Sequence, residues 1–112
     1  MIDSEDRSQL SIDGIKQAAR EGKLLFTDHA VRQMAKRSIL DTEVREAILS
    51  GEIIESYPDD KYSPSCLIYG HTEAGRALHV QCSFPPVVRV ITAYEPDAVE
   101  WTDNRARKRE KP

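Results

Sequence analysis

The character of the sequence changes at residue 52, and this change limits the folds that the chain can adopt. Before it, apolar residues recur at spacings of three and four, which is typical of amphipathic helices. After it, β-branched and aromatic residues alternate with polar ones between turn residues, as in short strands. We therefore expect a two-layer α+β domain in which two to three N-terminal helices pack on a four-stranded, mainly antiparallel sheet.

Three segments before residue 52 have helical spacing, at residues 9–22, from 27 or 28 to about 37, and 41–50. Each begins near a residue type that favours helix N-termini, and these are Ser8 or Ser11, Thr27 or Asp28, and Asp41. Gly22 and Gly51 stand where helix-ending glycines belong. The inward-facing residues expected on the second helix are Ala30, Val31 and Met34. Between the first two helices, residues 23–26 form a candidate edge strand.

Four strands are predicted after residue 52, and they are Glu52 to Tyr57, Ser65 to Gly70, Arg76 to Ser83, and Val87 to Tyr94. Strand alternation sends Leu78, Val80 and Cys82 to one face of the third strand. His79 then lies on the opposite face, with Gln81 and Ser83. In the fourth strand, alternation leaves open which face belongs to the core.

The length of 112 residues fits one domain, which we expect at residues 1–104, followed by a basic, disordered tail at residues 105–112. No apolar run approaches the roughly 20 residues of a membrane helix. The acidic N-terminus lacks the basic and apolar regions of a secretory signal. A cytoplasmic protein without membrane contact is therefore expected.

The residues that bind metals and phosphates are scattered along the chain. Cys66 and Cys82 lie in predicted strand interiors, where free thiols are usually inert. His29, His71 and His79 fall on a helix, in a turn and on a strand, and the glycines are isolated. Neither a metal nor another cofactor is expected.

One set of polar residues suits metal-free cleavage of RNA, in which the ribose 2′-OH attacks the adjacent phosphate. Histidine can act as the base or the acid, and arginine can stabilise the phosphate. The expected catalytic residues are His79, His29, Arg76, Tyr94 and Arg37. The expected substrate-binding residues are Lys36, Arg32, Arg89 and Thr92. The net charge of −3 counts against a strong nucleic-acid binder.

Each of these residues also has an ordinary structural role to weigh against the chemical one. His29 could pack at the start of its helix, and His79 could bond across the sheet. Tyr94 could be a half-buried packing ring. Convergence of the two histidines and Arg76 around an open cleft would favour catalysis, whereas a buried, fully bonded histidine would favour a binding or structural role.

Several strings in the sequence are similar to a known bacterial family, and they are Phe26-Thr27-Asp28-His29-Ala30, Arg37-Ser38-Ile39, Gly51-Glu52-Ile53-Ile54-Glu55, Gly75-Arg76-Ala77-Leu78-His79-Val80 and Ile91-Thr92-Ala93-Tyr94-Glu95-Pro96-Asp97 with Trp101. Over residues 24–101, the chain resembles the family known as domain of unknown function 4258. This resemblance implies a relative of the RelE and MqsR ribonuclease toxins, with a RelE-like fold. It also implies two partners: RNA, in particular mRNA, and a cognate antitoxin, for which the zinc-finger MqsA type is the expected class.

The family pattern falls on His29, Arg37, Arg76, His79 and Tyr94. Two positions depart from it, because Gln33 stands where many members have arginine and Ser38 replaces a common glycine. The leading hypothesis is a metal-independent endoribonuclease toxin of a type II toxin–antitoxin pair. The alternative is a non-catalytic module of the same fold that binds RNA or protein. A third possibility, a housekeeping domain without an RNA partner, is what the acidic composition alone favours.

Overall fold

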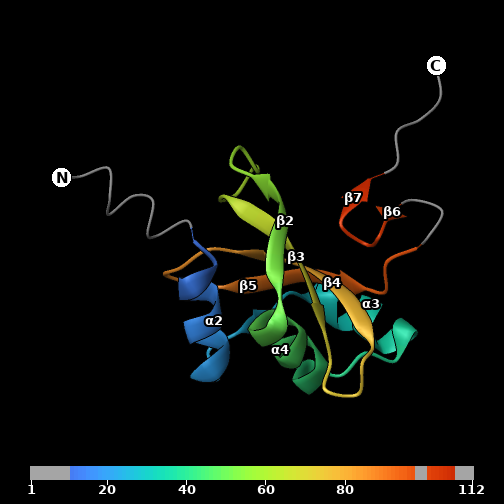
Figure 1. The fold of residues 1–112 in the computed structure, drawn as a ribbon. Coiled ribbons are helices and arrows are strands. Elements are labelled where there is room, and N and C mark those ends of the chain that lie inside the picture. The colour runs from blue at the N-terminus through green and yellow to red at the C-terminus, as the bar shows by residue number, and fades with distance from the viewer. Residues whose placement is uncertain (1–10, 98–100, 108–112) are drawn as a thin grey trace.

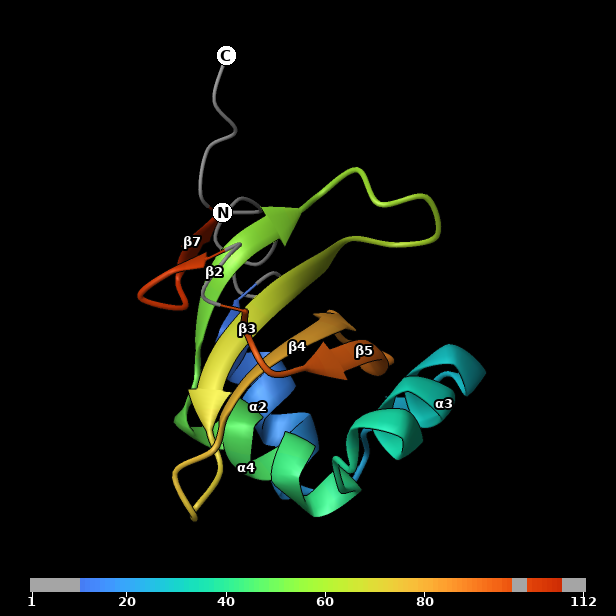
Figure 2. The same ribbon diagram turned by 90° about the vertical axis from the view of Figure 1, so that its right-hand side faces the viewer.

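A mixed five-stranded sheet carries helices on one face, and a short C-terminal hairpin lies beside the other face (Figures 1 and 2). The computed structural model describes residues 11–97 and 101–107. Its elements are α2 (Ile12–Arg20), β1 (Leu25–Phe26), α3 (Asp28–Arg37), α4 (Asp41–Ser50), β2 (Glu52–Tyr57), β3 (Ser65–His71), β4 (Ala77–Ser83), β5 (Arg89–Tyr94), β6 (Trp101–Thr102) and β7 (Ala106–Arg107). The expected order, helices first and sheet second, is confirmed in outline.

The helix boundaries follow from local capping. The Ser11 hydroxyl accepts a hydrogen bond from the Asp13 amide at 3.3 Å, and the Thr27 hydroxyl accepts one from Ala30 at 3.0 Å. These two caps were among the candidates in the sequence. Of the other candidates, Asp28 and Asp41 are the first residues of α3 and α4 rather than their caps, and Ser8 lies outside the described residues. Helix α3 ends at Ser38, which adopts the left-handed conformation with φ 55°.

The strand order is β1-β5-β4-β3-β2, so the expected count of four strands was too low. Strands β2 to β5 form an antiparallel meander, as predicted from their short connections. The fifth strand is the two-residue β1, which confirms the candidate edge strand at residues 23–26 and pairs in parallel with β5 through Leu25 and Arg89. This pairing makes the sheet mixed, and it joins segments too far apart in sequence for alternation to reveal.

A register shift in β5 decides which of its faces belongs to the core. Gln81 pairs with Thr92, but the next residue of β4, Cys82, pairs with Val90, so Ile91 is an extra residue in β5. Val88, Val90 and Ala93 are consequently buried. Simple alternation could not place these three residues on one face.

The core lies between the sheet and the helices. Ala47 of α4 approaches β3 so closely that a Cβ on Gly70 would lie 1.8 Å from the Ala47 carbonyl oxygen, which explains the glycine. On α3, Ala30 and Met34 are buried as expected. Val31 was expected to point inward but is 53% exposed, because α3 packs mainly against β5, next to the two-residue edge strand β1, and offers it only a narrow apolar stripe.

Residues 101–107 form the hairpin of β6 and β7 on the side of the sheet away from α2 and α4 (Figure 1). The domain boundary expected at residue 104 falls inside this hairpin. Arg105 and Arg107, which the sequence analysis assigned to the tail, bond to β2. The rest of the expected tail, from residue 108, lies outside the described part. No described helix has both the length and the apolarity needed to cross a membrane.

Candidate functional site

The sheet face opposite the helices, here called the open face, is divided between a cavity and a covered cluster. The cavity has a volume of about 710 Å³. Its lining residues are Thr27, His29, Asp60, Tyr62, Ser63, Gln81, Ser83, Arg89 and Ile91. The covered cluster consists of His79, Tyr69, Tyr94 and Trp101.

The cavity is assembled from three parts of the chain. The start of α3 supplies Thr27 and His29, and the loop between β2 and β3 supplies three polar residues. The remaining side chains come from β4 and β5. The Thr27 hydroxyl donates to the Ile91 carbonyl at 3.3 Å while capping α3, so one residue ties the start of this helix to β5. This tether holds the exposed His29 at the cavity.

A short chain of hydrogen bonds orders one wall of the cavity. The Ser65 hydroxyl donates to Asp60 Oδ2 at 2.7 Å, and Gln81 Nε2 donates to the same hydroxyl at 3.3 Å. Because Asp60 uses the hydroxyl proton, the Ser65 oxygen accepts from Gln81, and this fixes the orientation of the carboxamide. Across the lining, Tyr62 is 88% exposed. A large aromatic ring is therefore available to a ligand.

His79 lies at the centre of the covered cluster and is completely buried. Its Nε2 lies 2.6 Å from the Asn104 carbonyl oxygen. A carbonyl can only accept, so Nε2 carries the proton, and Nδ1 accepts from the Tyr94 hydroxyl at 3.3 Å. Burial lowers the pKa of His79, opposed by the hydrogen bond to Asn104. Both ring nitrogens of the buried His79 are therefore occupied by hydrogen bonds.

The C-terminal hairpin covers this cluster. Trp101 meets the His79 ring edge-on at a centroid separation of 4.4 Å. Arg105 bonds to Glu52 at 2.7 Å, and Arg107 bonds to Glu55 at 3.1 Å. Neighbouring Tyr57 also donates to Glu55, and burial, with this hydrogen bond as the second cause, raises the pKa of Tyr57 to about 12.

Arg76 belongs to neither part of the open face. Its guanidinium donates to the carbonyls of Arg37 and Ser38, each at 2.9 Å, and thereby closes the end of α3. It also bonds to Glu43 at 3.2 Å and Glu95 at 3.0 Å. These contacts make Arg76 a clamp between α3, α4 and the end of β5.

The residues predicted to act together are therefore separated. His29 and Arg89 share the cavity, whereas His79 and Tyr94 share the covered cluster. Arg37 lies near the cluster, with its guanidinium carbon 5.9 Å from the centre of the Tyr94 ring. Of the other residues expected to bind substrate, Arg32 and Lys36 are exposed on α3, and Thr92 is half-buried on β5.

Several residues at the two sites were not predicted as site residues. Gln81 and Ser83 share a face of β4 with His79, so alternation gave a usable indication for them. Asp60, Tyr62 and Ser63 come from a loop without periodicity. Their position depends on how the loop folds over the sheet, which no local pattern reveals.

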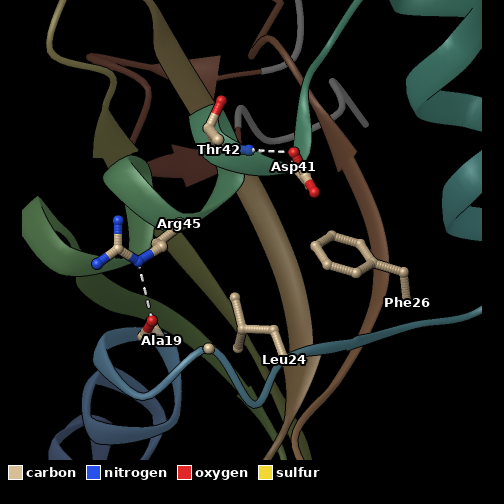
Figure 3. A pocket seen from close by; sticks show the side chains of 7 residues that line it. Ala19, Leu24, Phe26, Asp41, Thr42 and Arg45 are labelled. Atoms are coloured by element: carbon tan, nitrogen blue, oxygen red, sulfur yellow. Dashed lines mark hydrogen bonds between the residues drawn. The ribbon is translucent and has the colours of Figure 1, made fainter.

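The helical side of the molecule has a smaller pocket of about 160 Å³ (Figure 3). Leu24 and Phe26 form its apolar wall, and Arg45 at its rim donates to the Ala19 carbonyl at 3.0 Å. The Asp41 carboxylate accepts from the Thr42 amide at 2.7 Å. Polar groups at this pocket are thus committed to the fold, and the pocket is less suited to a polar ligand than the cavity.

Metal ligands are not grouped in the ranges 11–97 and 101–107, where no three His, Cys, Asp or Glu side chains could hold an ion together. Residues 26–95 match the family model described as domain of unknown function (DUF4258). The chain belongs to the DUF4258 family. Comparisons with curated proteins and with solved structures gave no match.

The range matched by the DUF4258 model includes the cavity and most of the covered cluster, but it ends before the hairpin that covers the cluster. All residues that line the cavity fall within the matched range, as do His79, Tyr69 and Tyr94 of the covered cluster. The hairpin at residues 101–107 lies outside it. The family model therefore includes the surface beneath the hairpin but not the hairpin itself.

Proposed function

We propose that this protein binds single-stranded RNA through the cavity on its open face. The observation that carries the proposal is that one cavity of about 710 Å³ combines His29 and Arg89 with the exposed ring of Tyr62. Single-stranded RNA is typically held by cations on its phosphates and aromatic rings on its bases. The cytoplasmic location expected from the sequence would give access to mRNA.

The cationic side of the proposed site continues along α3. His29, Arg32 and Lys36 are three and four residues apart, so they follow one another on the same exposed side of this helix. The acidic group in the cavity, Asp60, already accepts a hydrogen bond from Ser65. A phosphate chain running from the cavity along α3 therefore meets several cations, which offsets the negative net charge of the whole protein.

The test measures the fluorescence anisotropy of a labelled single-stranded RNA titrated with the full chain. Arg89→Ala is expected to weaken binding about tenfold, as for the loss of one charged hydrogen bond. Tyr62→Ala should weaken it through lost stacking, with a salt dependence that stays unchanged. Arg20→Ala, which removes an exposed arginine of α2 on the helical side, is the matched control. Equal effects of Arg20→Ala and Arg89→Ala would reject the cavity as the binding site.

A second candidate is the metal-independent endoribonuclease of a toxin–antitoxin pair, related to RelE and MqsR. One observation favours it: His29 could transfer a proton in the same cavity in which Arg89 could stabilise a phosphate. Incubation of RNA with the protein in excess chelator tests this activity. Cleavage should be lost in His29→Ala and kept in His71→Ala. The expected antitoxin would be recognised by relief of growth inhibition when the two proteins are expressed together.

A further inference from the structure

The cavity and the covered cluster are parts of one continuous surface. On β4, His79, Gln81 and Ser83 occupy alternate positions on the open face. The last two line the cavity, whereas His79 lies under the hairpin. Two residues of a strand span about 7 Å, so the covered His79 and the cavity-lining Gln81 are neighbours on this face, although no residue of the hairpin lines the cavity itself.

The hairpin, residues 101–107, is attached through one buried side chain, one hydrogen bond to His79, two ion pairs and the stacking of Arg105 on the Tyr69 ring at 4.9 Å. Among its described residues, only Trp101 is buried, at 2% exposure. Both ion pairs that hold it join side chains in contact with solvent, with exposures of 55% and 54% for Arg105 and Glu52. Its turn places Asp103 and Asn104 at positive φ, which costs some energy even for these residue types. Such a segment is expected to detach without unfolding of the core.

The groups beneath the hairpin suit the ligand proposed for the cavity. Tyr69 and Tyr94 offer rings on which bases could stack, and His79 offers an imidazole that could bind phosphate or exchange a proton. When the hairpin is closed, the Asn104 carbonyl accepts a hydrogen bond from Nε2 of His79, and the Trp101 ring packs against the imidazole. Glu52 and Glu55 lie on the edge strand β2, where Glu52 pairs with Tyr69, so these two carboxylates lie beside the covered surface while β3 separates them from the cavity side of β4.

We propose that the hairpin is an autoinhibitory strap, which restricts RNA to the cavity when closed and adds the surface of His79, Tyr69 and Tyr94 when open. The identity of the ligand rests on the proposed function, but the movement of the strap does not. RNA that contacts the uncovered surface binds the open form more tightly, so ligand and strap opening favour each other.

The experiment uses the full chain with Arg105→Gln and Arg107→Gln combined. Diethyl pyrocarbonate modification, followed by mass spectrometry, reports the accessibility of His79, with the exposed His29 and His71 as internal references. The double variant is expected to increase His79 labelling about threefold to tenfold, since two surface ion pairs are lost. RNA affinity should rise by a similar factor although the protein loses two positive charges. Lys16→Gln with Arg20→Gln on α2 is the control of equal charge, and should weaken binding slightly.

The results distinguish whether the hairpin opens from whether its opening changes RNA binding. Unchanged His79 labelling in both the double variant and a folded Trp101→Ala variant would overturn the strap. Increased labelling with RNA binding weakened as in the charge control would show that the strap opens without regulating the site, which also overturns the inference. If no variant, nor the wild-type chain, binds RNA while labelling increases, the proposed function fails and the moving hairpin remains.

Discussion

The two parts of the open face are built on the same strand but differ in what lies above them. At the cavity, the half-buried Gln81 of β4 faces the space beneath a loop and the start of α3, next to the buried Ser83. At the covered cluster, His79 of the same strand is sealed by Trp101 and Asn104. The comparison shows that strand position alone does not make a residue available for chemistry, because a segment far along the chain decides its solvent contact.

Removal of Trp101 should have the largest effect, because it is the buried anchor of the hairpin. Trp101→Ala is expected to cost about 3 kcal/mol of the free energy of unfolding, at the lower end for a buried tryptophan. Urea denaturation measures the loss, and amide exchange should show lost protection at residues 102–107. Tyr62→Ala, at the cavity, should change stability by less than about 0.5 kcal/mol because its ring is exposed. Similar losses for the two variants would contradict the distinction between covered and open parts.

Loss of the Thr27 hydroxyl should act on the cavity side. Thr27→Ala removes both the cap of α3 and the bond to the Ile91 carbonyl, and is expected to cost about 1–2 kcal/mol. It should also weaken RNA binding by loosening His29. The matched variant Ser11→Ala removes the cap of α2 on the helical side and should leave RNA binding unchanged. Equal RNA affinities in the two variants would show that the Thr27 tether does not position the site.

The fold was predictable where it depends on neighbours in sequence. Ser11 and Thr27 cap helices through contacts of two and three residues, and the meander follows from short connections. The pairing of β1 with β5 and the extra residue Ile91 were not predictable, because both depend on contacts across the fold.

The same limit applies to the candidate site. The position of His79 on the open face followed from alternation, but its burial depends on Asn104, 25 residues further along the chain. Arg76 was predicted to bind phosphate because it is an arginine in the matching sequence string. Its hydrogen bonds to the carbonyls at the end of α3 depend on the fold. His29 and Arg89 meet in one cavity through the packing of α3 against β5.

Acidification should distinguish the two histidines of the open face. Burial lowers the pKa of His79, so the unfolded chain binds a proton more readily than the folded one. The stabilising contribution is present above pH about 6.5 and declines as the pH falls from there toward the folded pKa. We therefore expect the free energy of unfolding to fall between pH 7.5 and 5, measured by urea denaturation. This pH dependence of stability should disappear in His79→Gln and remain in His29→Gln. The opposite pattern would mean that His79 is not the histidine whose burial makes stability depend on pH.

The ion pairs of the hairpin should have the smallest effect on stability. Glu52→Gln removes the partner of Arg105 at an exposed position, and is expected to cost about 0.5 kcal/mol. The cost should shrink in concentrated salt, whereas that of Trp101→Ala should not. A loss above about 2 kcal/mol that shrinks in concentrated salt would mean that the ion pair, rather than Trp101, holds the hairpin.

The central claim, that RNA occupies the cavity, is tested most directly by histidine NMR of the wild-type chain during titration with single-stranded RNA. His29 lies in the cavity, whereas His71 lies at the opposite end of β3 from Ser65, which contacts the cavity wall. We expect saturable shifts of the His29 ring resonances that exceed those of His71, because His71 bonds to Tyr69 at 3.1 Å and responds only when RNA also reaches the covered cluster. Unchanged His29 resonances, or equal shifts of both histidines, would contradict the central claim.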